Sequence, residues 1–425
     1  MSVDMDVYQY LLNYSDYKQG KKIAIAVSGG SDSIALLTMA CESVGRENII
    51  ALTFDHRLRE ESTKEAEFVR DYCQKIGCKH QTLTLPKDKS LQATQKAARE
   101  MRYRYLRSYC IVENISYLLT AHHCDDQMET YYIRLLQNSE LWGMAAIADD
   151  YNDGNIHILR PLLRMKSVEL KDYLKQKDIN WVEDPSNQNP KYLRSQIRHL
   201  RKENKLKDIE LAPLQTYRQA LTNIVNDWVA KHVLVKGIGC LLITKEAFIL
   251  LSLELRLHIL RLCLHYIGKG NYFLSLSKLE YIYDDLLSSD LFSAAGCLSF
   301  SDDDFIYIQH EYRSQKSRDI FCFDNCFTIF DNRFHIFHPK SRGVELIYVG
   351  DCTNNSSQQI DVLLQQSNKK KYRYIKALPI VIYEKNNIIY PEILQKTWSD
   401  GSIKLSLIDI LGVSYCQKYF IDPSF

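Results

Sequence analysis

Apolar and polar residues alternate in blocks over the first third of the chain. Short apolar runs, each long enough for a buried strand, are separated by longer segments in which apolar residues recur every three or four positions, as in amphipathic helices. The expected strands are 23–27, 49–54, 80–85 and 117–121, and the expected helices are 31–44, 62–76 and 91–113. This alternation predicts an α/β fold in which a parallel sheet is connected by helical crossovers.

The pattern changes after about residue 210. Leu- and Tyr-rich segments around 212–235 and 254–267 predict helices, and shorter apolar runs between 297 and 307 predict strands. A chain of 425 residues is long enough for two or three domains. We expect a parallel-sheet domain over 1–208, with a basic part over about 160–208, a helical and mixed domain over 209–335, and a small α+β domain over 340–425.

The connection between the first strand and the first helix consists of small and polar residues: Ser28, Gly29, Gly30, Ser31, Asp32 and Ser33. The two glycines let the backbone approach an anion without a Cβ in the way, and the helix N-terminus supplies N–H groups, so the turn is suited to hold a phosphate. Asp32 cannot bind an anion directly, and we expect it to bind a Mg²⁺ that accompanies the phosphates. An ordinary Gly/Ser turn is the alternative interpretation.

This loop lacks the lysine of the GxxxxGK[ST] phosphate loop, and no such segment occurs elsewhere in the chain. The string SGGSDS instead resembles the PP-loop of the ATP pyrophosphatase superfamily. Members of that superfamily cleave ATP between the α- and β-phosphates and activate a carbonyl as its adenylate. The resemblance implies a PP-loop ATPase domain that uses ATP and Mg²⁺.

A second polar string, HHCDDQMET at residues 122–130, begins where the fourth strand ends. Asp125, Asp126 and Glu129 are therefore expected at or near a helix N-terminus, where Asp126 and Glu129 share one face. Because the carboxyl ends of parallel strands meet at one edge of the sheet, this string, the phosphate loop and Asp55-His56 are predicted to converge on one crevice. Stabilisation of the helix dipole is the alternative role for these acids.

Charge is concentrated in one region rather than spread over the chain. The formal net charge is only +2, yet residues 160–207 contain thirteen Lys and Arg against six Asp and Glu. This excess suits a nucleic-acid surface, and a solvated helical face is the alternative.

The twelve cysteines form no CxxC pair and have no zinc-type spacing, which predicts reduced thiols. The first residues carry acids and no apolar signal-peptide core, so we expect a cytoplasmic protein without membrane association.

Several motifs together resemble the bacterial tRNA(Ile)-lysidine synthase family over about residues 20–200. After SGGSDS they are FDHRLREES (54–62), AAREMRY (97–103), HHCDDQMET (122–130), RLL (134–136), RPLL (160–163) and WVEDPSN (181–187). HHxDDQxET followed by RPLL and WVEDPSN distinguishes this family within the superfamily.

The resemblance implies a two-step ligase reaction on isoleucine tRNA with the anticodon CAU. ATP adenylates the C2 oxygen of the wobble cytidine and releases pyrophosphate. The ε-amine of free L-lysine then displaces AMP, giving lysidine.

The resemblance also assigns roles to residues. The catalytic candidates are Asp32, Asp126 and Glu129, of which Asp32 binds Mg²⁺ and the other two bind the substrate lysine. The nucleotide-binding candidates outside the PP-loop are His56, Arg99 and Arg102, and the tRNA-contacting candidates are Arg194, Arg198 and His199. Arg99 and Arg102 could equally be a surface pair, and His56 could be structural.

The lysine nucleophile sets a chemical requirement. Its free ε-amine has a pKa of about 10.4, so at pH 7 only about one molecule in 2,500 is unprotonated, a shortfall of roughly 4.6 kcal/mol. Carboxylates are needed to bind the cation, and one of them could take its proton.

Two departures from the family pattern stand out. The turn after RLL, small and glycine-containing in the family, here reads Gln137-Asn138-Ser139-Glu140, and the family's RNRIRH reads RSQIRH at 194–199. Two other classes of function remain open. The first is another PP-loop enzyme, either an amide-forming synthetase that acts on a small carboxylate or a tRNA thiolase, which would need a reactive cysteine such as Cys124. The second is a non-catalytic tRNA-binding module, which would not need the carboxylates. The sequence leaves the oligomeric state open, with a homodimer as one option.

Overall fold

The computed structural model describes residues 7–14, 17–55, 57, 60–84, 95–152, 156–183, 193–235, 239–268 and 274–311, together with seven strands beyond residue 311. The chain divides into two compact units, one containing Met1–Thr222 and the other Asn223–Lys418. Within the described ranges, no helix is both long and apolar enough to cross a membrane. The three domains expected from the sequence, over 1–208, 209–335 and 340–425, stay a prediction.

A six-stranded sheet forms the centre of the first unit, in the order β3-β2-β1-β4-β6-β5. Its strands are β1 (Ile23–Ala26), β2 (Ile49–Asp55), β3 (Lys79–Thr84), β4 (Tyr117–Leu119), β5 (Asp150–Asn152) and β6 (His157–Leu159). Every neighbouring pair is parallel except β5 and β6. The predicted parallel α/β sheet is therefore confirmed, and the structure adds β5 and β6, which are too short to give an apolar run.

Helices cover both faces of this sheet. They are α1 (Val7–Leu11), α2 (Ser31–Ala40), α3 (Glu60–Ile76), α4 (Gln95–Val112), α5 (Cys124–Leu136), α6 (Leu141–Met144), α7 (Ser167–Gln176) and α8 (Leu193–Lys202). The predicted helix 31–44 is α-helical only to Ala40, and a π-helical turn, η1 (Cys41–Gly45), and a 3₁₀ turn, η2 (Arg46–Asn48), lead into β2.

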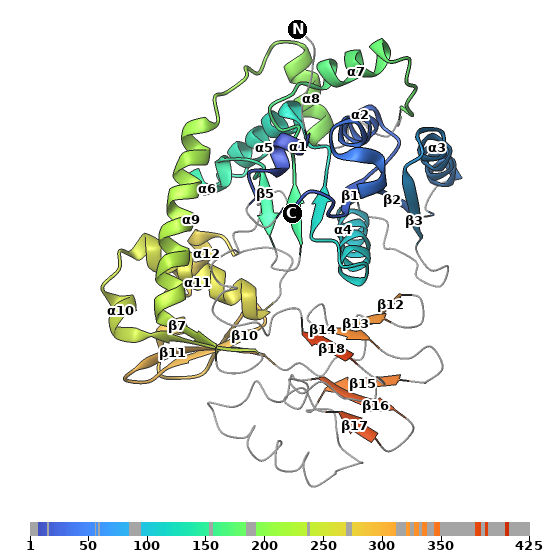
Figure 1. The fold of residues 1–425 in the computed structure, drawn as a ribbon. Helices are drawn as coiled ribbons and strands as arrows, with labels where there is room; N and C mark the ends of the chain where they lie inside the picture. Colours follow the sequence, from blue (N-terminus) through green and yellow to red (C-terminus); the bar gives the residue numbers. More distant parts are fainter. Residues whose placement is uncertain are drawn as a thin grey trace. The chain divides into compact units, whose positions relative to one another are not determined.

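The alternation of side chains along β1 explains the two layers. Ile23 and Ile25 are fully buried in the cluster that contains residues of α1, α2, α3 and α7, whereas Ala24 belongs to the cluster built on α4. Successive strand residues point to opposite faces, so α2 and α4 pack on opposite sides of β1 (Figure 1). Each fully buried Ile contributes roughly 1.5–3 kcal/mol to this packing.

The turn after α5 accommodates the departure from the family pattern without glycine. Asn138 has φ +50°, a left-handed conformation that asparagine tolerates better than most residues. The Ser139 N–H donates to Arg134 O (2.9 Å) and the Asn138 N–H donates to Leu135 O (3.1 Å), which is a Schellman cap. Glu140 has φ −65° and leads into α6, so its position does not require a glycine.

The second unit contains an antiparallel sheet in the order β7-β8-β11-β10-β9. Its elements are β7 (Val233–Val235), β8 (Cys240–Thr244), α10 (Lys245–Ile249), α11 (Leu253–Gly268), α12 (Leu276–Tyr281), α13 (Tyr283–Leu287), β9 (Phe292–Ala294), β10 (Cys297–Ser301) and β11 (Phe305–His310). The long helix α9 (Ala212–His232) spans the boundary between the two units. The predicted helix 212–235 is wrong for its last three residues, Val-Leu-Val, which pair with β8 instead.

Beyond residue 311 the described elements are strands. They form two antiparallel sheets, β12-β13-β14-β18 and β15-β16-β17. Their bounds are β12 (Ile320–Phe323), β13 (Phe327–Phe330), β14 (Phe334–Phe337), β15 (Val344–Tyr348), β16 (Pro379–Tyr383), β17 (Asn387–Ile389) and β18 (Lys404–Leu407).

Candidate active site

The PP-loop turns sharply between β1 and α2. Gly29 has φ +88°, which residues with a Cβ rarely adopt, and Gly30 is the N-cap of α2. The buried Ser33 hydroxyl donates to Gly30 O (2.9 Å) and accepts from the Ser28 N–H (3.1 Å), so it ties the loop together from inside. Gly29 O in turn accepts from the N–H of Val182 (2.9 Å), which brings residues 181–183, the start of the WVEDPSN segment, to the loop. This is a compact cradle at a helix N-terminus, as predicted for a phosphate site.

Asp32 is held from two sides at the start of α2. Its Oδ1 accepts from the Ser167 hydroxyl at the start of α7 (3.1 Å), and its Oδ2 lies 3.5 Å from His123 Nε2. Burial alone would raise the pKa of Asp32, but the hydrogen bond and charge of His123, with Ser167 and Lys171, outweigh it and lower that pKa. A third of the side chain stays exposed, so an ionised oxygen faces solvent beside the loop.

His123 connects the PP-loop with the second polar string. It is the N-cap of α5, and its Nε2 lies 3.5 Å from Asp126 Oδ2 as well as 3.5 Å from Asp32 Oδ2. Burial lowers its pKa, but the three carboxylates Asp32, Asp126 and Asp125 dominate and raise it to about 9. Asp32 and Asp126 therefore lie close together at one edge of the sheet, as their positions after strand ends predict.

The Nδ1 atom of His123 has a partner in either protonation state. The neutral ring can accept from the Asp125 N–H (3.2 Å), whereas the protonated ring can form an ion pair with Asp125 Oδ2 (3.6 Å). The Asp126 carboxylate completes the cap of α5 by accepting from the His123 N–H (3.1 Å). The capping role considered for these acids is thus present, and it orients Asp126 within the cleft.

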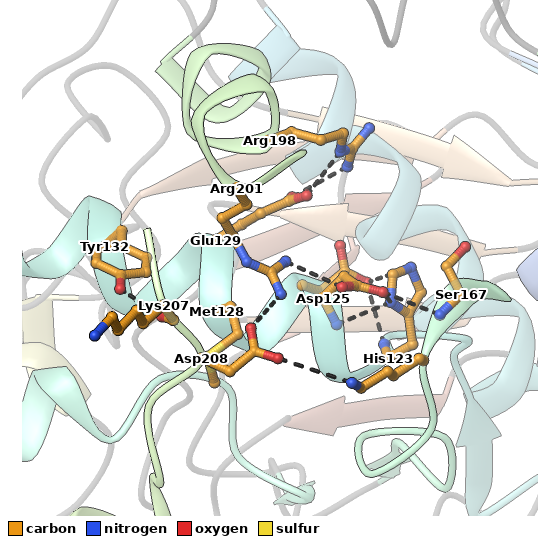
Figure 2. A network of polar contacts seen from close by, with 12 residues as sticks. His123, Asp125, Met128, Glu129, Tyr132, Ser167, Arg198, Arg201, Lys207 and Asp208 are labelled. Carbon is orange, nitrogen blue, oxygen red and sulfur yellow. Dashed lines mark hydrogen bonds and ion pairs between the residues drawn. The ribbon is translucent and has the colours of Figure 1, made fainter. Parts of the chain in front are cut away.

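Glu129 lies one turn further along α5 and is fully buried. Its Oε2 accepts from Arg194 Nε (2.8 Å) and Arg198 Nη2 (3.1 Å), and its Oε1 accepts from Arg198 Nε (2.7 Å). Arg194 also donates to Asp126 Oδ1 (3.2 Å). The two arginines predicted to contact tRNA phosphate thus face the carboxylates predicted to bind lysine, and Figure 2 shows Arg198 against Glu129. Both assignments stay predictions.

A third arginine of α8, which is not among the sequence-based candidates, also pairs with α5. Arg201 donates to Asp125 Oδ1 (3.0 Å) and to Asp208 Oδ1 (2.7 Å), while Asp125 Oδ2 accepts from the Ser167 N–H (3.0 Å), as drawn in Figure 2. The positions 194, 198 and 201 lie on one face of a helix, and this spacing is the signal in the sequence that could have revealed the contact.

A basic cluster lies around His122, at the end of β4. The Arg99 Nη2 donates to His122 Nε2 (3.3 Å), which leaves Nδ1 to donate to Thr120 Oγ1 (3.0 Å). Burial, and then the positive charges of Arg99, Arg160, Arg194 and Arg102, hold the pKa of His122 well below its ordinary value. Several guanidinium groups around a neutral imidazole make a site suited to an anion.

The two predicted arginines of α4 belong to this region. The guanidinium groups of Arg99 and Arg102 both lie over the ring of Tyr103, at 5.3 and 5.5 Å from its centroid. The structure brings Arg99 to His122, so it is not merely a surface residue.

The remaining sequence-based candidates are placed as follows. His56 lies outside the described residues, but the preceding Asp55 is buried and accepts from the Ser62 hydroxyl (2.6 Å), the Arg57 N–H (2.9 Å) and the Thr63 hydroxyl (3.1 Å). His199 has 71% of its side chain exposed, and its Nε2 lies 3.2 Å from Glu203 Oε1.

No group of three or more His, Cys, Asp or Glu side chains in the described part of the chain is arranged to hold a metal ion. A Mg²⁺ at Asp32 would therefore take most of its ligands from phosphate and water, which is common for this ion.

Comparison with known proteins agrees with the motifs. The family model of the PP-loop domain matches residues 3–203. The tRNA(Ile)-lysidine synthase of Orientia tsutsugamushi (strain Boryong) is 29% identical over 450 aligned residues, with 99% of each chain covered. That of Zymomonas mobilis subsp. mobilis (strain ATCC 31821 / ZM4 / CP4) is 40% identical over 185 residues, covering 43% of this chain and 56% of the relative.

Among solved structures, the U34-tRNA thiolase NcsA from Methanococcus maripaludis has a TM-score of 0.41 and 15% identity over 51% of this chain and 77% of that chain. This similarity is too low to support an argument about function. The tRNA(Ile)-lysidine synthase of Wolbachia pipientis wMel is 32% identical over 302 residues, which cover 67% of this chain and 68% of the relative. With this extent of similarity, and with the PP-loop and acidic string meeting in one cleft, the chain belongs to the tRNA(Ile)-lysidine synthase family.

Proposed function

We propose that this chain is an ATP-dependent ligase that forms a carbon–nitrogen bond, converting the wobble cytidine of isoleucine tRNA with the anticodon CAU to lysidine. The observation that carries this proposal is the shared contact of Asp32 and Asp126 with His123 Nε2, each at 3.5 Å. This contact supports the proposal because the turn proposed to bind phosphate and the carboxylate proposed to bind the incoming cation lie close together, as a reaction between an adenylate and an amine requires.

In the first step, the C2 oxygen of the cytidine attacks the α-phosphate of ATP and pyrophosphate leaves. The N–H groups at the start of α2 and the hydroxyls of Ser28 and Ser31 would bind the leaving pyrophosphate. A Mg²⁺ bound through Asp32 would supply positive charge to those phosphates. Arg99 and Arg102, in the basic cluster around His122, would stabilise the negative charge that develops at the α-phosphate.

In the second step, the ε-amine of lysine attacks C2 and AMP leaves with the former C2 oxygen. Asp126 is suited to bind the lysine ammonium because 16% of its side chain stays exposed, whereas Glu129 is fully buried and bonded to two arginines. We therefore assign Asp126 to lysine and Glu129 to positioning Arg194 and Arg198. At neutral pH His123 carries a proton, because its pKa is raised to about 9, so it is not the base that deprotonates lysine.

The basic part over 160–208 and the domains over 209–335 and 340–425 are proposed to bind the tRNA. The side chain of His199 is 71% exposed, as expected of a residue that contacts a phosphate. Arg194 and Arg198 would contact phosphate only by leaving a carboxylate partner.

The thiolase alternative depends on Cys124, the first residue of α5. Burial and the charges of Asp125 and Asp208 raise the pKa of its thiol, the reverse of what a sulfur-transferring cysteine needs. The discriminating assay incubates the protein with ATP, tRNA and either lysine or a sulfur donor and measures AMP. Lysine-dependent AMP release is expected, and AMP release that depends on the sulfur donor would refute the proposal.

A further inference from the structure

Arg194 connects the two carboxylates predicted to bind lysine. It stands in the first turn of α8, where its Nη2 lies 3.2 Å from Asp126 Oδ1 and its Nε lies 2.8 Å from Glu129 Oε2. Its side chain is 38% exposed, whereas Asp126 is 16% and Glu129 0% exposed. A cation therefore already occupies the position where the substrate ammonium would meet Asp126.

Glu129 does not depend on Arg194 alone for its counter-charge. Arg198 makes two hydrogen bonds to it, from Nε (2.7 Å) and Nη2 (3.1 Å). Figure 2 shows this bidentate pair above α5. Departure of Arg194 would thus leave Glu129 paired with Arg198, while Asp126 Oδ1 would gain room for another donor.

The carboxylates of Asp126 and Glu129 already have guanidinium partners without substrate. Arg194 pairs with both of them, and Arg198 pairs with Glu129. A lysine ammonium added to this cluster brings an extra positive charge into a partly buried site. Such a charge is costly unless it is paired, so lysine binding favours the loss of a resident cation or the arrival of an anion.

Arg194 also lies close to the PP-loop. The Asp126 carboxylate that it contacts is 3.5 Å from His123 Nε2, and the same nitrogen is 3.5 Å from Asp32 at the start of α2. A nucleotide phosphate bound at the PP-loop would attract the guanidinium away from Asp126, and the exposure of the side chain leaves it space to move.

We propose that Arg194 is a counter-ion of Asp126 that the substrate lysine replaces. Bound nucleotide draws Arg194 toward its phosphates, so lysine binds more tightly to the enzyme that already holds nucleotide. This inference rests on the proposed function. It makes Arg194 a residue that sets both the order of binding and the preference for a cationic amino acid, because a neutral side chain cannot take the place of a guanidinium beside a carboxylate.

The test is calorimetric titration of L-lysine into the full chain, with and without a non-hydrolysable ATP analogue and Mg²⁺. The analogue is expected to raise the lysine affinity about tenfold, within the usual range of coupling between two ligands. In Arg194→Gln the lysine affinity without nucleotide should rise. The coupling, which is the ratio of the lysine affinities with and without the analogue, should fall to near one. Arg194→Lys, which keeps the charge, should retain part of the coupling.

Lys202→Gln is the matched control, since Lys202 is an exposed cation on the same helix. It should show the coupling of the unaltered protein. Two results would overturn the inference in a protein that still releases AMP in the presence of lysine. One is the same coupling in Arg194→Gln as in the unaltered protein, and the other is a lysine affinity of the unaltered protein that does not change with the analogue. If the unaltered protein neither binds lysine nor releases AMP with it, the proposed function fails as well.

Discussion

The buried carboxylate of Glu129 provides the sharpest test of how α8 is held against α5. Glu129→Gln keeps the size of the side chain and removes its charge. In the structure, three charge-assisted hydrogen bonds of 2.7, 2.8 and 3.1 Å from Arg194 and Arg198 converge on a fully buried group. Hydrogen bonds to charged groups contribute about 1.5–3 kcal/mol each, but the arginines are 37–38% exposed and regain water when the partner changes. We expect a loss of about 3 kcal/mol in the free energy of unfolding.

A loss of this size lowers the melting temperature of a unit of this length by about 6–12 °C. Thermal unfolding followed by circular dichroism measures it. Glu183→Gln is the control, because Glu183 is 73% exposed and its 3.4 Å pair with Lys171 should contribute about 0.5 kcal/mol or less. The positioning role would be refuted if the two variants had similar melting temperatures while only Glu129→Gln bound lysine more weakly. That result would favour direct contact of Glu129 with lysine.

Three further predictions concern the same cleft. Asp126→Asn should leave ATP binding largely intact while abolishing lysine-dependent AMP release, and an unchanged lysine affinity in this variant would contradict its assignment. His123 has a folded pKa of about 9, above the ordinary histidine value of 6.5, so it contributes stability that is fully present below pH 6.5 and lost as the pH rises through 9. Urea unfolding of His123→Gln at pH 6 and pH 10 should therefore show the larger destabilisation at pH 6, and equal losses would argue against a charged ring. Gly29→Ala places a Cβ at φ +88°, which should cost roughly 1–2 kcal/mol and weaken ATP binding in a filter assay, whereas unaltered stability and binding would show that the turn needs no glycine.

The sequence predicts the central sheet and the meeting point of its motifs because these depend on local pattern. Apolar runs locate β1 to β4, and polar residues that follow parallel strands must lie at one edge of the sheet. Asp32 and Asp126, 94 positions apart, can thus be placed in one cleft from pattern alone. The short strands β5 and β6 and the strand at Val233–Val235 escape prediction. β4 is equally short, but it lies in the longer, mostly apolar segment 117–121.

The arginines of α8 show where prediction from sequence ends. A basic helix in a tRNA-modifying family suggests contacts to phosphate, yet Arg198 bonds to a carboxylate 69 positions earlier. Only the packing of α8 on α5 decides which face of the helix meets the acids. The same holds for His123, whose imidazole joins Asp32 to Asp126 although nothing in the sequence distinguishes it from the neighbouring His122.

Mass analysis of the anticodon nucleosides after reaction with isotope-labelled lysine tests the account most directly. Full-length chain, ATP, Mg²⁺ and isoleucine tRNA with the anticodon CAU should yield a wobble nucleoside that has gained one labelled lysine and lost one water, with one AMP and one pyrophosphate formed per modified tRNA. A wobble cytidine that stays unlabelled while AMP accumulates, or one that carries sulfur instead, would contradict it.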